Sequence, residues 1–216
     1  MKLFVNINEI WTSLEENPFG QIEIYKNKAI LTSRGEIIRI DDEKNLVEEY
    51  PRVDRFDCEG KNLMPGFVDP HTHPVFFKTR EEEFIMRGQG KDYEEIAAAG
   101  GGIRNSVRAL RQASYEQLFE LSVPRINKFL EFGTTTIEAK SGYGLSVEDE
   151  LKTLRVIKEL DEKLAITMVP TFLGAHEIPD EYRNDKQKYI DIICQEMIPR
   201  VKEENLAIFC DVFCEK

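Results

Sequence analysis

The stretch Pro65-Gly66-Phe67-Val68-Asp69-Pro70-His71-Thr72-His73 decides the fold predicted for this chain. The apolar run Leu63 to Val68 predicts a short buried strand that leads to two histidines spaced i, i+2. Alternate side chains of an extended strand share a face and lie roughly 6.6 Å apart along it. His71 and His73 can therefore converge on one metal ion while Thr72 points away.

A histidine pair at a strand end is typical of a metal site. Imidazole nitrogen suits zinc, iron, nickel or cobalt, and a site with few protein ligands leaves room for an activated water. The alternative is a pair of surface histidines that bind nothing. The chain contains three histidines and two of them lie here, after a Pro-Gly turn, so the pattern favours a metal site.

Length and charge limit the classes of protein to consider. The chain has 216 residues, 41% of them hydrophobic, which is enough for one large core or two small ones. Its 29 basic and 40 acidic residues give a net charge of -11, which repels nucleic acid and anionic lipid. No apolar run approaches the roughly 20 residues that span a bilayer, and Met1 to Ile10 lacks the pattern of a signal peptide. We therefore expect a cytoplasmic protein with no nucleic-acid partner and no membrane association.

The cysteines predict reduced thiols. Four of them, Cys58, Cys194, Cys210 and Cys214, do not form a secreted disulfide framework in a chain of this length. Cys210 and Cys214 lie roughly 13 Å apart if a strand joins them, which is too far for one metal ion. Both are interpreted as small buried residues of a strand.

Residues 1–60 predict a small β domain. Short apolar runs separated by turn residues indicate strands at Lys2–Ile7, Gln21–Tyr25, Lys28–Thr32 and Glu36–Ile40. The segment from Asn8 to Glu16 is interpreted as one or two helical turns. No long helical period occurs in this part of the chain.

From residue 61 to the end, strand and helix patterns alternate. Strands are predicted at Thr134–Ala139, Ala165–Leu173 and Leu206–Phe213, and helices at Ile103–Gln112, Ser114–Phe132, from Ser146 onward and at Lys186–Glu203. Two of the helices begin with capping sequences, Ser114 with Gln117 and Ser146 with Asp149. The alternation predicts parallel βαβ units, either in part of a barrel or in an open doubly wound sheet.

Two further side chains near strand ends are candidates for a site. Tyr143 lies between Gly142 and Gly144, where a phenol can approach a ligand closely or can be an exposed turn residue. His176 follows the predicted strand that ends at Leu173 and is either a third metal ligand or a neutral imidazole that contacts a substrate. In a barrel, catalytic groups belong at the carboxyl ends of strands, where both residues are placed.

The sequence around the histidine pair resembles a known superfamily. The run from Asp57 through Gly60 to His73 is similar to the opening signature of the amidohydrolases, which are metal-dependent hydrolases built on a (β/α)8 barrel. The likeness runs from about Gly35 to the last residue. It narrows to the imidazolonepropionase family in four later segments, Ile96-Ala97-Ala98-Ala99-Gly100-Gly101-Gly102-Ile103, Lys140-Ser141-Gly142-Tyr143-Gly144-Leu145, Pro170-Thr171-Phe172-Leu173-Gly174-Ala175-His176 and Asp211-Val212-Phe213-Cys214-Glu215-Lys216. Members of this family are about twice as long, so the resemblance covers their N-terminal portion.

The resemblance implies both an architecture and a reaction. The fold class is α/β, with a partial (β/α)8 TIM-like barrel over residues 61–216, preceded by a small N-terminal β-sandwich-type domain over residues 1–60 that is incomplete without C-terminal strands. His71 and His73 would bind one metal ion, zinc or iron. Arg80, Tyr143 and His176 would bind the substrate, 4-imidazolone-5-propanoate, which is hydrolysed to N-formimidoyl-L-glutamate in histidine degradation. The remaining ligands and the acid/base groups belong to later strands in the family, so no catalytic residue is assigned in this chain.

Only the resemblance selects Arg80 and raises the question of Lys140. On the sequence alone, Arg80 belongs to a charged cluster with Lys78 and Glu81, whereas a guanidinium in the site would pair with a substrate carboxylate. Some amidohydrolases carry a carbamylated lysine at the position of Lys140, and burial near a metal would depress its pKa. Because the closer family resembles a one-metal enzyme, Lys140 stays off the site, and Glu138 is interpreted as a structural neighbour.

Two alternatives remain open for the function. The chain is another amidohydrolase, of the cytosine deaminase or dihydroorotase type, or it is a non-catalytic truncated fragment. Two imidazoles bind a metal loosely and an open half-barrel exposes apolar surface, so we expect no activity from the chain alone. An unpaired sheet edge is also a reason for self-association into a homo-oligomer.

Overall fold

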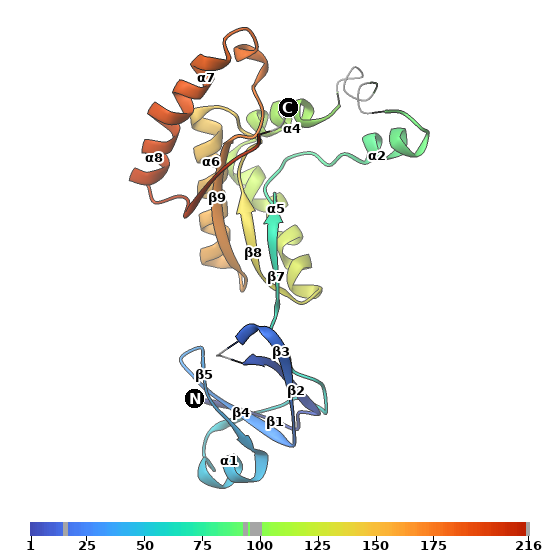
Figure 1. Cartoon of the computed structure of the whole chain (residues 1–216), viewed down its shortest axis with the longest axis vertical. Coiled ribbons are helices and arrows are strands. Elements are labelled where there is room, and N and C mark those ends of the chain that lie inside the picture. The colour runs from blue at the N-terminus through green and yellow to red at the C-terminus, as the bar shows by residue number, and fades with distance from the viewer. Residues whose placement is uncertain (15–16, 93–94, 96–100, 215–216) are drawn as a thin grey trace. The chain divides into compact units, whose positions relative to one another are not determined.

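The chain forms two compact units, Met1–Pro65 and Gly66–Lys216. The structure is a computed structural model, and it describes the whole chain except residues 15–16, 93–94, 96–100 and 215–216 (Figure 1). The division between the units follows Pro65, a few residues beyond the boundary expected from the sequence. Parts of two family-like segments, Ile96–Gly100 and Glu215–Lys216, lie outside the described residues.

The N-terminal unit is built from a four-stranded sheet and a separate two-stranded one. The larger sheet has the order β5-β4-β1-β6, and the smaller one pairs β2 with β3. The elements are β1 (Lys2–Val5), β2 (Glu9–Leu14), β3 (Asn17–Lys26), β4 (Lys28–Ser33), β5 (Glu36–Asp42), α1 (Glu43–Glu49) and β6 (Asp54–Asp57). Strand β1 pairs antiparallel with β4 and parallel with β6.

Strand β4 is buried on both faces, which explains its continuous apolar run. Ala29 and Leu31 pack with Leu46 of α1 on one face, and Ile30 packs in a second cluster with Ile10 of β2 on the other. Alternate residues of a strand point to opposite faces, so one strand serves both clusters. The short apolar runs of this unit thus correspond to strands that are buried against their neighbours.

The helical interpretation of Asn8 to Glu16 is wrong. Residues Glu9–Leu14 form strand β2, which pairs antiparallel with β3, with Ile10 opposite Tyr25. The isolated segment is too short to show a helical period, and its hairpin partner decides its conformation. An ion pair joins Glu9 to Lys26 across this hairpin at 3.0 Å.

The C-terminal unit contains a curled parallel sheet of four strands in the order β10-β9-β8-β7. Its strands are β7 (Phe67–Thr72), β8 (Thr134–Lys140), β9 (Thr167–Ala175) and β10 (Phe209–Val212), and β7, β8 and β9 lie side by side in Figure 1. The helical elements are α2 (Glu81–Gly88), α4 (Ile103–Gln112), α5 (Tyr115–Glu131), α6 (Val147–Lys163), η1 (Asp180–Tyr182), α7 (Lys186–Ile192), the π-helical η2 (Ile193–Met197) and α8 (Ile198–Glu203).

The strand order distinguishes the two architectures that the sequence allowed. Each new strand is added on the same side of the previous one, from β7 to β10. A doubly wound sheet reverses direction at a switch point, whereas a barrel adds its strands in sequence. Within the described sheet the order is that of a barrel, and the resemblance to barrel enzymes had favoured the same choice.

The helix caps and apolar faces are largely as predicted. Ser114 and Gln117 form a complete capping box at α5, and the Ser146 side chain accepts a hydrogen bond from the Asp149 N–H at α6. The apolar residues Leu151, Leu154 and Leu160 of α6 are fully buried in the main core. Each such burial stabilises the fold by about 1.5–3 kcal/mol.

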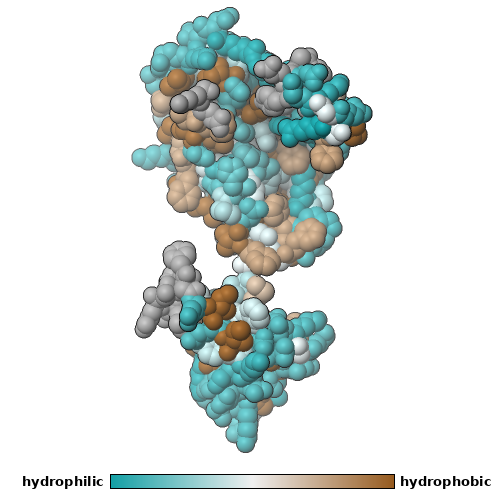
Figure 2. Space-filling model, turned by 45° about the vertical axis from the view of Figure 1, so that its right-hand side comes forward, coloured by the Kyte–Doolittle hydropathy of each residue, from teal (hydrophilic) through white to brown (hydrophobic). Residues whose placement is uncertain are grey.

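The two outer strands of this sheet are more exposed than the sequence predicts. The buried strand expected from Leu63 to Val68 is wrong, because β7 begins at Phe67 and its first residues, Phe67 and Val68, are 55% and 65% exposed. The cysteines at the other edge are also exposed, including Cys210 on β10 and Cys214. Both strands are edges of the described sheet with a partner on one side only. Figure 2 shows that apolar side chains reach the surface of both units.

None of the helices in the described ranges combines the length and the apolar character that crossing a membrane requires. Helix α2, which the sequence does not predict, is short and carries three acidic residues in its first turn, Glu81, Glu82 and Glu83.

Candidate active site

The candidate site lies at the carboxyl ends of three neighbouring strands. His71 is the penultimate residue of β7 and His73 follows the strand directly, while β8 ends at Lys140 and leads to Tyr143. Strand β9 ends at Ala175, immediately before His176. Because parallel strands direct their carboxyl ends to the same edge of a sheet, these side chains meet although they are far apart in sequence.

The predicted ring side chains form one cluster around His73. The ring of His73 stacks on that of His176 with centroids 4.9 Å apart and planes 10° apart. Its centroid is 5.0 Å from that of Tyr143 and 5.9 Å from that of His71. Tyr143 and His176 are themselves 5.5 Å apart between ring centroids. The structure therefore brings together the two predicted ligands and two of the predicted substrate-binding residues.

Arg80 completes this cluster from the segment before α2. Its guanidinium carbon lies 5.9 Å from the centroid of the Tyr143 ring. Its Nε and Nη2 both donate to the hydroxyl of Ser106 at 3.0 Å, and Ser106 is buried on α4. A positive group is thus held beside the phenol by a buried hydroxyl.

The loop that carries Tyr143 is held by a buried carboxylate. Glu150 of α6 accepts hydrogen bonds from the backbone N–H groups of Gly142 at 3.0 Å and of Gly144 and Leu145 at 2.8 Å. Its side chain is fully buried, so these donors replace the water it gives up. The sequence interpretation missed Glu150, although a glutamate in the first turn after a glycine-rich loop is a usable signal.

Gly142 is required by a close contact. Its φ of +108° lies in the left-handed region, and a Cβ there would be 2.8 Å from Nδ1 of His176. His176 Nδ1 also lies 2.8 Å from the Gly142 carbonyl oxygen. Since a carbonyl only accepts, Nδ1 carries the proton and Nε2 is left as the acceptor nitrogen of the neutral ring.

Curated proteins match this chain in sequence, whereas no family model matches it. The curated imidazolonepropionase of Solibacter usitatus is 54% identical over 159 residues, which are 74% of this chain and 38% of that protein. Those of Desulfotalea psychrophila and Thermoanaerobacter pseudethanolicus are 44% and 42% identical, over 91% and 99% of this chain and 48% and 52% of their own lengths.

The chain is a relative of the imidazolonepropionases. It spans about half the length of the curated imidazolonepropionases that it matches. The resemblance predicted from its motifs is thus confirmed at the level of sequence.

Solved structures agree at the level of fold. Guanine deaminase of E. coli superposes with a TM-score of 0.60 at 15% identity, over 97% of this chain and 46% of that one. A metal-dependent hydrolase from Pyrococcus furiosus gives a TM-score of 0.52 at 13% identity, over 80% of this chain and 50% of that one. At these identities the likeness shows that this imidazolonepropionase relative shares the fold of the two solved structures. The likeness says nothing about the substrate.

In this imidazolonepropionase relative, burial favours the neutral forms of His73, His176 and Tyr143. It lowers the pKa of His73 to about 4, and the nearby His176 adds to the effect. It also lowers the pKa of His176, opposed by the hydrogen bond with Gly142. The pKa of Tyr143 is raised by burial and opposed by the charge of Arg80. At neutral pH the cluster therefore contains neutral imidazole at His73 and His176 beside a protonated phenol.

Lys140 lies in an ion-pair network that sequence reasoning missed. Its ammonium is 2.8 Å from Glu138 Oε1 and 2.8 Å from Asp211 Oδ2, and Thr171 donates to Glu138 at 2.7 Å. Burial lowers the pKa of Lys140, but the hydrogen bonds to Asp211 and Glu138 outweigh it and the pKa is raised. Two carboxylates favour the ammonium form of Lys140. Glu138 is more than a neighbour, since it joins β8 to β9.

The residues present fit a metal ion at the histidine pair. Among the described residues, no group of three or more His, Cys, Asp or Glu side chains could hold one. Nδ1 of His73, however, is buried without a hydrogen-bond partner in the described part of the chain. A buried polar atom without a partner is rare in native structures and is expected where an ion or water binds. Two imidazole nitrogens are suitable ligands for zinc or iron and form an incomplete set.

Proposed function

We propose that this chain is the N-terminal part of an imidazolonepropionase and supplies half of its active site. The complete enzyme would hydrolyse 4-imidazolone-5-propanoate to N-formimidoyl-L-glutamate, a step of histidine degradation. The observation that carries the proposal is the convergence of His71, Arg80, Tyr143 and His176 around His73 at one edge of the sheet. This edge is where barrel enzymes place their substrates.

The side chains of the cluster suit the parts of this substrate. Arg80 would pair with the propanoate carboxylate, since a guanidinium binds a carboxylate with two parallel hydrogen bonds. Tyr143 would donate its hydroxyl proton to the ring, and Nε2 of His176 would accept a proton from a ring N–H. Holding the substrate at both ends orients its carbonyl for attack, which lowers the barrier of a reaction with water.

His71 and His73 would hold one metal ion, zinc or iron. When bound, such an ion lowers the pKa of water towards neutrality and polarises a carbonyl. The reaction adds the water oxygen to the ring carbonyl carbon and breaks its bond to nitrogen, which takes up a proton. Because the described chain offers two imidazoles for the ion, the remaining ligands and the acid/base group are proposed to lie in the other part of the complete enzyme.

The proposal also includes the architecture of the complete enzyme, its location and its partners. In the complete enzyme the four parallel strands would belong to a (β/α)8 barrel, and the N-terminal sheets to a β-sandwich-type domain completed by strands from elsewhere. The protein would act in the cytoplasm on a small-molecule substrate, without nucleic acid or a membrane as partner. The exposed edge residues Phe67, Val68, Phe209 and Val212 support the expectation that the isolated chain is inactive and self-associates.

A chimera tests the proposed function. The chain is joined to the remaining length of the Thermoanaerobacter pseudethanolicus relative, and hydrolysis of 4-imidazolone-5-propanoate is followed by product analysis with zinc or iron present. We expect N-formimidoyl-L-glutamate from the chimera, little from the chain alone, and loss of turnover in the H71A/H73A variant. Turnover of cytosine or dihydroorotate, with none of the imidazolone, would assign the chain to another amidohydrolase instead.

A further inference from the structure

Helix α4 contacts all three segments that carry the proposed substrate-binding residues, although it contributes no ring to the cluster. Ser106 accepts both hydrogen bonds of Arg80. Arg111, further along the same helix, binds the loop of Tyr143. Arg104 pairs at 3.5 Å with Asp180, in the segment that follows His176. Helix α4 thus connects the three segments through side-chain hydrogen bonds and an ion pair.

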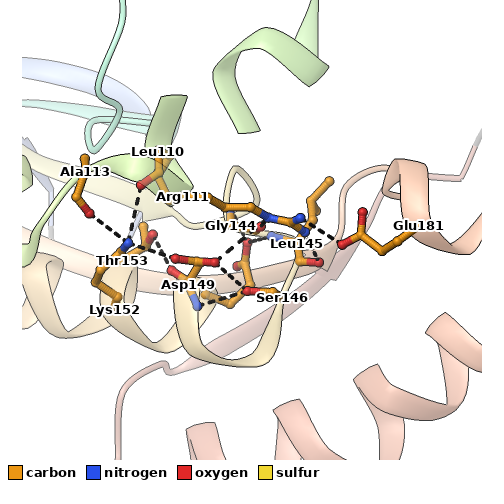
Figure 3. Close-up of polar contacts among 11 residues, drawn as sticks. Leu110, Arg111, Ala113, Gly144, Leu145, Ser146, Asp149, Lys152, Thr153 and Glu181 are labelled. Atoms are coloured by element: carbon orange, nitrogen blue, oxygen red, sulfur yellow. Dashed lines mark hydrogen bonds and ion pairs between the residues drawn. The ribbon is translucent and has the colours of Figure 1, made fainter. Parts of the chain in front are cut away.

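The guanidinium of Arg111 makes the most direct of these links (Figure 3). Its Nε donates to the Gly144 carbonyl at 2.7 Å and its Nη2 to the Leu145 carbonyl at 2.8 Å. Its Nη1 lies 2.8 Å from Oε1 of Glu181. One rigid planar group therefore joins the loop after β8 to the segment after β9.

The loop is held from two directions by groups of opposite polarity. Glu150 accepts its N–H groups, while Arg111 donates to its carbonyls. Asp149 supports this arrangement, because its carboxylate lies 3.9 Å from Arg111 Nε and 2.8 Å from the Lys152 ammonium. Figure 3 shows Asp149 between these two basic side chains and the cap residue Ser146.

The hydrogen bonds, rather than the ion pair, are the stronger part of the contact. Glu181 is 44% exposed, and ion pairs at the surface contribute little because water screens them. Hydrogen bonds from a charged donor to backbone carbonyls are stronger than neutral ones and have a fixed direction. A lysine can keep the charge beside Glu181, but it cannot donate to two successive carbonyls in the same geometry.

We propose that Arg111 is a positioning residue that fixes Tyr143 relative to His176 by binding the carbonyls of Gly144 and Leu145 and the carboxylate of Glu181. It acts through these loops and touches neither ring. The claim that this alignment aids substrate binding rests on the proposed function. The alignment itself does not depend on that function.

Amide hydrogen exchange in the 216-residue chain tests the alignment without any ligand. The amides of Gly142, Gly144 and Leu145 report on the loop, since each donates to Glu150. In R111Q and R111K we expect them to exchange about tenfold or more faster, because a charged hydrogen bond is lost at each carbonyl. Amides in the core of α6, such as those of Leu154 and Ile157, should keep their rates.

Two variants separate this role from general stability. R155Q removes another forked arginine contact, to Glu204, and should leave the loop amides unchanged. E181Q keeps the bonds of Arg111 to the loop and should therefore raise their exchange less than R111Q does. Loop amides that keep the wild-type rate in R111Q, a uniform rise that includes α6, or full restoration by R111K would each overturn the proposal.

A binding measurement addresses the link to substrate. The probe is 3-(imidazol-4-yl)propanoate, which carries an imidazole ring and a propanoate, titrated by calorimetry. If the wild-type chain binds it, R111Q should bind it about tenfold more weakly and R155Q equally well. If R111Q and wild type bind it equally, Arg111 does not position the site. Faster loop exchange in R111Q together with no binding by wild type would support the alignment and count against the proposed substrate-binding roles of Arg80, Tyr143 and His176 in this chain.

Discussion

His73 packs against three other ring side chains, and that environment sets its chemistry. Burial favours the neutral form of its imidazole, and its Nδ1 has no hydrogen-bond partner among the described residues. A neutral imidazole with a free nitrogen is able to bind a metal ion without first releasing a proton. His71, an exposed residue at the end of the same strand, offers the second nitrogen.

A metal-binding prediction follows for single residues. Zinc titrated into the chain should bind weakly. Loss of a residue that hydrogen-bonds to a metal ligand lowers metal affinity roughly tenfold to hundredfold. H73A should lower the zinc affinity by more than this, because it removes a proposed ligand. H176Q is the matched control, since it removes a stacked ring but neither proposed ligand. Calorimetry gives both affinities. Equal binding by H73A and wild type would remove the histidine pair from consideration as a metal site.

Gly142 provides a second test at this scale. We expect G142A to lower the free energy of unfolding by more than about 1–2 kcal/mol, since a Cβ adds backbone strain at φ +108° and meets His176 Nδ1 at 2.8 Å. G35A is the control, because Gly35 has a φ of +84° but a Cβ added there would meet nothing within 4 Å. Urea unfolding measures both. Equal losses in the two variants would show that the His176 contact is unimportant.

At the scale of elements, a sequential parallel sheet is held together by helices and by contacts that join consecutive βα units. Arg155 on α6 binds Glu204, just after α8, through two hydrogen bonds of 2.8 and 2.7 Å. The hydrogen bonds to Arg155 lower the pKa of Glu204, against a smaller effect of burial. This pair connects the helices that flank β9 on either side in sequence.

The pH dependence of this pair can be predicted in sign. A carboxyl with a lowered pKa in the folded state contributes stability above its unfolded value of 4.5, and this contribution is lost as the pH falls through the folded pKa. E204Q should therefore be less stable than wild type by roughly 0.2–1 kcal/mol at pH 7, with the gap closing as the pH falls below 4.5. Urea unfolding across that range measures the gap. A gap that widens in acid would contradict the assigned role.

At the scale of the whole molecule, the described sheet ends in two exposed edge strands. Unpaired backbone groups with apolar side chains beside them are prone to pair with other chains. We expect V68K, on β7, to reduce self-association at micromolar concentration because a charged side chain discourages edge pairing, while V68T should not. Sedimentation velocity measures the distribution of species. If V68K and wild type show the same species, association does not use this edge.

The sequence by itself determined the features that depend on near neighbours. The helix caps, the apolar face of α6, the alternation of strand and helix and the histidine pair all follow from residues within a few positions of one another. The motifs around Tyr143 and His176 were also local, and the resemblance they carry placed both residues at a common site.

Only the tertiary structure decided which distant groups meet. Lys140 and Asp211 are 71 positions apart, and Arg111 is 34 positions from Leu145, so neither periodicity nor spacing relates them. The sequence left the strand order open, and it predicted wrongly the burial of Val68 and Cys210 at the edges and the conformation of Glu9–Leu14, which a hairpin turns into a strand. The physical reason is that local sequence sets the conformation of a segment, whereas burial and hydrogen bonding depend on which segments pack against it.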